Sequence, residues 1–80
     1  MSQNAELEHI VRKARDAKNG GFGVLSTGEK LAVAFVLNRP DWLAEMNYTL
    51  VEAIDRIGWE WMLLIPKAAR ILEEEDEQDE

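Results

Sequence analysis

An uninterrupted run of seven apolar residues, Leu31–Leu37, constrains the fold of this 80-residue chain more than any other feature. An element that is apolar on every side has to be covered on every side, so we expect this run at the centre of the core. A chain of this length forms one domain and buries roughly 60% of the surface that it exposes when unfolded. We expect Leu31 and Phe35 within the run, and Ile54 from another apolar segment, to be almost fully buried.

Seven residues are too few for periodicity to separate a buried helix from a buried strand. In a central helix over about residues 27–38, Ser26 and Glu29 have the spacing of a capping box. In the alternative, residues 23–25 pair with the apolar run as a β-hairpin. The valine and phenylalanine residues of the run suit a strand. The two alanines within the run favour a helix, and the helix is our prediction.

The rest of the chain carries helical patterns of its own. Further helices are predicted over residues 4–18, 40–46, 49–58 and 59–72. Gly20 suits a left-handed C-cap of the first helix, and Pro40 suits the first position of the next. Thr49 and Glu52 have the spacing of a second capping box. Pro66 is expected to kink the last helix without ending it, and two abutting helices are the alternative.

The net charge of −7 comes from the end of the chain. Residues 73–80 hold seven of the 16 acidic residues, so nine acidic residues remain against nine basic ones. Blocks of like charge stay solvated, which predicts a disordered acidic tail that aids solubility or serves as an arm for a basic partner. The predicted fold class is therefore all-α, a compact bundle of four or five short helices over residues 1–72 followed by this tail.

The composition argues against several functions. The chain has no cysteine, which excludes disulfides and thiolate zinc sites and fits a reducing, cytoplasmic location. No apolar run approaches 18 residues, so we expect no membrane span, and no leader is visible at the start. The glycine-rich stretch at residues 20–23 lacks the Gly-Lys-Ser/Thr ending of a phosphate loop, so we expect no nucleotide cofactor.

Catalytic chemistry is not indicated either. His9 is the single histidine, it points away from the apolar stripe of its helix, and we expect it to be exposed without a partner. A hydrolytic triad needs a base, a nucleophile and an orienting group, which no segment supplies together. Glu45, Glu52 and Asp55 fit capping and surface roles. We therefore expect no catalytic residue, no metal site and no enzyme activity.

Two surfaces are candidates for binding. The last predicted helix has a second apolar face that either lies under a neighbouring helix or stays open as a protein contact. This face comprises Trp59, Met62, Leu63 and Pro66. The first predicted helix has a basic face that either contacts phosphates or attracts the protein's own acidic tail. This face comprises Arg12, Lys13, Arg15 and Lys18.

These features lead to one expected function and two alternatives. We expect a small non-enzymatic protein-binding module, an inhibitor or adaptor, whose size and acidic end are compatible with accessory proteins of phages and plasmids. The first alternative is a nucleic-acid-associated regulator that uses the basic face, and the second is a structural homo-oligomer such as a dimer. A DNA-reading helix-turn-helix is disfavoured, because the helix after Gly58 presents apolar rather than basic side chains.

Overall fold

The computed structural model describes residues 2–78 of the chain, with the side chains of residues 4–75. The helices are α1 (Ser2–Asp16), the π-helical turn η1 (Ala17–Gly21), the 3-10 turn η2 (Phe22–Val24), α2 (Thr27–Val36), α3 (Pro40–Glu45), α4 (Leu50–Ile57) and α5 (Trp59–Gln78). The described residues contain no β-strand, so the predicted all-α class is confirmed.

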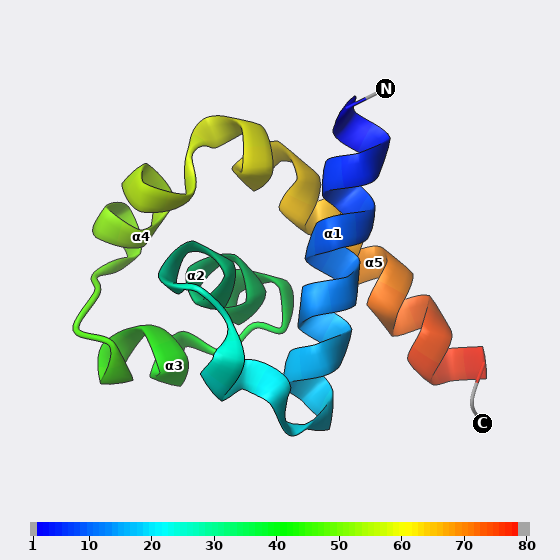
Figure 1. Ribbon diagram of the computed structural model, residues 1–80, viewed down its shortest axis with the longest axis horizontal. Helices are drawn as coiled ribbons and strands as arrows, with labels where there is room; N and C mark the ends of the chain where they lie inside the picture. Colours follow the sequence, from blue (N-terminus) through cyan, green and yellow to red (C-terminus); the bar gives the residue numbers. More distant parts are fainter. Residues whose placement is uncertain (1, 79–80) are drawn as a thin grey trace.

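Helix α2 lies at the centre of the molecule, with α1 and α5 on one side and α3 and α4 on the other (Figure 1). Residues 31–34 are at most 2% exposed, as expected for a run that is apolar all round. The prediction of a central helix is thereby confirmed, and the hairpin alternative is wrong. Residues 23–25, the other strand of that hairpin, form part of η2 and the connection to α2.

Both predicted capping boxes are present. The backbone N–H of Glu29 donates to the Ser26 hydroxyl at 3.3 Å, and the Ser26 N–H donates to the Glu29 carboxylate at 3.0 Å. At the start of α4, the same two bonds join Thr49 and Glu52 at 3.1 and 3.0 Å. Each box satisfies two backbone donors that a helix start leaves free, which explains why α2 and α4 begin at these points.

Residues with positive φ end several helices. Gly20 has φ +97°, which confirms the predicted left-handed position after the first helix. Asn38 and Asn47, after α2 and α3, have φ of 57° and 63°, a region that asparagine tolerates better than most residues. Gly58 separates α4 from α5 with φ 90° and ψ 147°, a conformation that is essentially restricted to glycine.

The buried residues form two groups on either side of α2. The larger group joins α1, α2 and α5, with Ile10 and Ala14 of α1 against Leu64 and Ala68 of α5. The smaller group joins α2, α3 and α4 and comprises Leu31, Ala34, Leu43 and Ala53. Partly buried residues, among them Trp42, Met46 and Ile57, pack against this smaller group.

Two predictions of burial are wrong. Ile54 is 42% exposed, and Phe35 is half-buried and contacts both buried groups. The exposure of Ile54 has a physical reason: α4 packs closely only against α2 and α5, so one side of α4 has no neighbour to cover it. The prediction for Leu31, which is 0% exposed, is confirmed.

Helix α5 is a single helix that contains Pro66, so the alternative of two abutting helices is wrong. The acidic segment begins within α5, which extends to Gln78. The Arg15 guanidinium donates two hydrogen bonds to the Glu75 carboxylate, which ties the end of α5 to α1. The last two residues of the predicted disordered tail over residues 73–80 lie outside the described residues.

Candidate protein-binding surface

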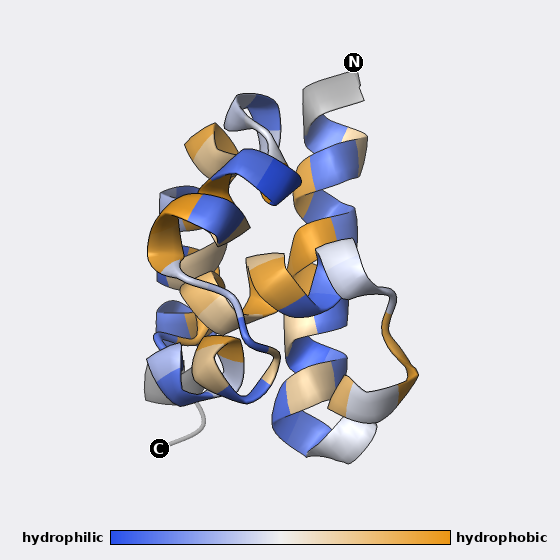
Figure 2. Cartoon of the chain, turned by 90° about the vertical axis from the view of Figure 1, so that its left-hand side faces the viewer, coloured by the Kyte–Doolittle hydropathy of each residue, from blue (hydrophilic) through white to orange (hydrophobic). Residues whose placement is uncertain are grey.

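The apolar side chains that remain exposed are concentrated where α4 meets α5. The large exposed apolar residues are Val24, Leu50, Val51, Ile54, Trp59 and Leu63. All but Val24 lie on α4 or on the first two turns of α5. Figure 2, which looks at the side of the molecule formed by α3 and α4, shows hydrophobic segments on this side as well as in the interior. Exposed apolar surface that is gathered in one region, rather than scattered, is typical of a contact site.

We name the predicted face of the last helix, Trp59, Met62, Leu63 and Pro66, the α5 face. Trp59 is 71% exposed and Leu63 is 63% exposed, so the structure leaves this face largely uncovered. Pro66 is also exposed, whereas Met62 is half-buried and packs against the larger buried group. Successive residues of a helix are about 100° apart around its axis. When the buried side of α5 faces α1 and α2, residues 59, 63 and 66 therefore point outward.

A second exposed face, which we name the α4 face, comprises Leu50, Val51 and Ile54. Leu50 is 58% exposed and Val51 is 75% exposed. The sequence analysis expected Ile54 to be almost fully buried and did not single out Val51. A signal was present, because the apolar residues of α4 cover more of its circumference than one narrow stripe requires.

The two faces are close to each other across Gly58. The Gly58 N–H donates to the Ile54 carbonyl at 3.0 Å, and the Met62 N–H donates to the Gly58 carbonyl at 3.1 Å. Ile54 and Met62 are therefore each one hydrogen-bonded turn from Gly58. The α4 face and the α5 face lie on consecutive helices that pack against each other.

The basic face of α1 makes contacts within the molecule. Arg15 pairs with Glu75, and this attraction raises the pKa of the guanidinium. The interpretation that this face attracts the protein's own acidic segment is confirmed for this pair. Of the other predicted phosphate-contacting residues, Arg12 and Lys18 are exposed and Lys13 is half-buried.

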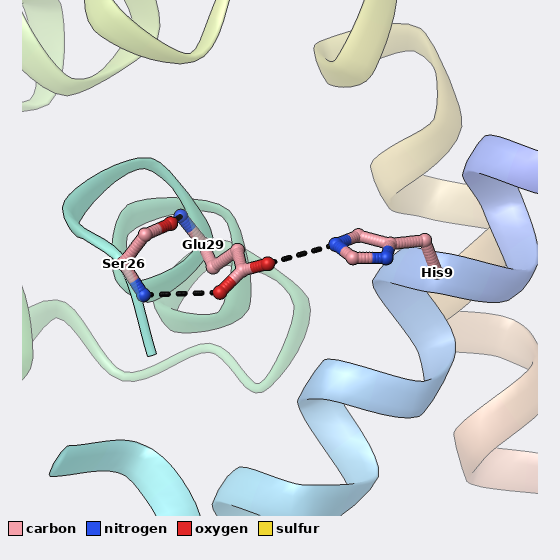
Figure 3. Close-up of polar contacts among 3 residues, drawn as sticks. All are labelled: His9, Ser26 and Glu29. Atoms are coloured by element: carbon pink, nitrogen blue, oxygen red, sulfur yellow. Dashed lines mark hydrogen bonds and ion pairs between the residues drawn. The ribbon is translucent and has the colours of Figure 1, made fainter. Parts of the chain in front are cut away.

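The prediction for His9 is wrong, because His9 is half-buried and bonded to Glu29 (Figure 3). An ionised carboxylate can only accept, so His9 Nε2 donates to Glu29 Oε2, at 2.8 Å. The His9 ring also lies against Trp61, with centroids 5.8 Å apart. The bond joins α1 to the first turn of α2, which the sequence could not indicate because the residues are 20 positions apart.

Glu29 consequently has two roles, in the capping box and in the contact with His9. The pKa of its carboxyl is lowered, chiefly by the bond from the Ser26 backbone N–H and further by the bond from His9, while burial opposes the shift. Ser26 has no bond to His9, since its hydroxyl accepts from the Glu29 N–H (Figure 3). The three residues therefore stabilise the start of α2 and lack the serine–histidine contact of a hydrolytic triad.

Comparison with known proteins finds no matching family model, no matching curated protein and no matching solved structure. Within the part of the chain that the structure describes, no helix is both long enough and apolar enough to cross a membrane. The same residues contain no group of three side chains placed to hold a metal ion. The uncovered apolar region at α4 and α5 is therefore the principal candidate site.

Proposed function

We propose that this protein is a small non-enzymatic protein-binding module, an inhibitor or adaptor, that contacts another protein through the α5 face. The observation that supports the proposal is the exposure of Trp59 and Leu63, at 71% and 63%, on a helix whose other side is buried. Tryptophan and methionine are enriched at protein interfaces, and tryptophan is a frequent hot spot of binding energy.

The partner is proposed to be a different protein rather than a second copy. The segment that contains α3, α4 and the start of α5, residues 40–60, has five acidic residues and one basic residue, a net charge of −4. A symmetric dimer brings the same surface of two copies together, so these carboxylates would oppose one another. The nucleic-acid alternative is weaker, because Arg15 of the basic face is engaged by Glu75.

The test uses the double variant Trp59→Ser with Leu63→Ser and the control Val24→Ser, which changes an apolar residue that is 89% exposed outside both faces. Both variants should remain folded, with melting temperatures within a few degrees of the parent. A protein captured from the source organism is then purified and titrated against all three proteins. We expect the double variant to bind at least tenfold more weakly and the control to bind like the parent.

Three outcomes contradict the proposal. Unfolding of the double variant shows that the α5 face belongs to the core. Equal binding of the purified partner to the parent and the double variant places the contact elsewhere. Self-association of the parent that is detected by sedimentation and lost in the double variant makes the occupant a second copy.

A further inference from the structure

The α4 face lies beside an apolar groove. This groove has a volume of about 220 Å³ and is lined by Ala34, Phe35, Asn38, Arg39, Pro40, Leu43 and Leu50. Leu50 belongs to both the groove and the α4 face, so the α4 face borders the groove at this residue. Half-buried Phe35 and exposed Leu50 are thus placed to contact a large apolar side chain that enters the groove.

Negative charge borders this apolar region. Asp55 lies one helical turn after Val51, and Glu60 lies three residues before Leu63. Residues three or four apart are neighbours on a helix, so Asp55 lies beside Val51 and Glu60 lies beside Leu63. Both acidic residues are exposed, and neither forms an ion pair among residues 4–75, whose side chains the structure describes. Asp41 differs, because the Arg39 guanidinium donates to it and lowers the pKa of its carboxyl.

A second copy of this chain does not complement such a surface. Two copies joined by their α4 faces would place Asp55 and Glu60 near the same carboxylates of the partner, and like charges at an interface are unfavourable. The basic face of α1 has the right charge, but the apolar stripe of α1 is buried, with Ile10 1% exposed and Val11 6% exposed. An occupant that combines apolar and cationic groups therefore has to come from another molecule.

An α-helix suits this surface better than an extended segment. The described residues offer no strand edge to which an extended backbone could add. A helix satisfies its own backbone hydrogen bonds and can insert a row of apolar side chains between two diverging helices. We propose that the α4 face and its groove bind a cationic amphipathic helix of a partner protein, an inference that rests on the function proposed above.

The test titrates the full chain with a synthetic helical peptide of about 18 residues, five turns long, that has leucines on one face and lysines on the other. A matched peptide has glutamate at every lysine position. Isothermal titration calorimetry should show saturable one-to-one binding of the lysine peptide. Its dissociation constant should be at least tenfold lower than that of the glutamate peptide. Raising the salt from about 0.05 to about 0.5 M should weaken the binding, because exposed charges are then screened.

Variants identify the site. Leu50→Ser with Val51→Ser, two residues that are 58% and 75% exposed, should weaken binding of the lysine peptide at least tenfold without unfolding the protein. Asp55→Asn with Glu60→Gln should weaken it several-fold and reduce its dependence on salt. Val24→Ser is the control and should bind like the parent.

Two results overturn the inference. If the lysine peptide binds the Leu50→Ser, Val51→Ser variant as tightly as the parent, the attraction comes from charge elsewhere, such as the acidic segment at residues 73–80. If both peptides bind equally, the surface does not select a cationic partner. Either result leaves the proposed function standing, since that function is tested by Trp59 and Leu63 with the protein's own partner.

Discussion

Helices α2 and α4 begin in the same way but differ in burial. Both begin with a capping box, and both are rich in apolar residues. In α2 the residues Leu31 to Ala34 are almost completely buried, whereas in α4 only Ala53 is buried. Helix α2 packs closely against α1, α3, α4 and α5, while α4 packs closely against α2 and α5 alone. Local pattern therefore explains where the helices form, and the number of neighbours explains which side chains are covered.

The largest expected effect comes from truncating matched residues of the two helices. Leu31→Ala should destabilise the protein by about 2–5 kcal/mol, because it leaves a cavity at a site with 0% exposure. Leu50→Ala, at a site with 58% exposure, should cost well under half of that value. Denaturant unfolding of both variants measures the difference. Equal losses would mean that α4 is as well covered as α2.

Removing either capping box should have an intermediate effect. Ser26→Ala and Thr49→Ala each remove the hydroxyl that accepts a backbone N–H, at a cost of about 1 kcal/mol. In a domain of this size, 1 kcal/mol corresponds to roughly 4–8 °C in melting temperature. If both caps act locally, the two losses should add in the double variant. A strongly non-additive result would show that the starts of α2 and α4 depend on each other.

The ionised Glu29 carboxylate, which accepts bonds from the Ser26 backbone N–H and from His9, should make the stability of the folded protein depend on pH. The folded-state pKa of Glu29 lies below 4.5, so the ionised form stabilises the folded protein. This contribution is present above about pH 4.5 and is lost as the pH falls through the folded-state pKa. Glu29→Gln should therefore be less stable than the parent above about pH 4.5, and the difference should shrink as the pH falls below that value. A gap that widens on acidification would reverse the sign and contradict this account of Glu29.

The smallest expected effect is at the junction of α1 and α5. Arg15→Gln removes the exposed pair with Glu75, and exposed ion pairs contribute about 0.2–1 kcal/mol. The effect should shrink further in high salt, because the charges are screened. Thermal unfolding at low and high salt measures it. A loss of several kcal/mol would mean that the acidic end of α5 is an integral part of the core.

The sequence predicted those features of the structure that depend on interactions between residues close together in the chain. The Ser26–Glu29 and Thr49–Glu52 bonds span three residues, so both capping boxes could be predicted. The contacts of His9 with Glu29 and of Arg15 with Glu75 span 20 and 60 residues and depend on how the helices pack.

The candidate site was predicted in part for the same reason. Helical phase alone separated Trp59 and Leu63 from the buried side of α5. The exposure of Ile54 could not be predicted in this way, because it depends on a neighbour that α4 lacks. Phe35 is similar, since it packs against both buried groups but also lines the groove beside Leu50.

The central claim is that the apolar residues of the α4 face, Leu50, Val51 and Ile54, and the exposed residues of the α5 face, such as Leu63, lie at the surface, unlike the buried residues of α2. The most direct measurement is methyl NMR with a soluble paramagnetic agent, at a concentration where sedimentation shows a single species. We predict strong broadening of the methyl signals of Leu50, Val51 and Leu63, and protection of those of Leu31 and Val33. Equal protection of both sets would contradict the claim, since it would mean that α4 and the α5 face are covered in the free protein.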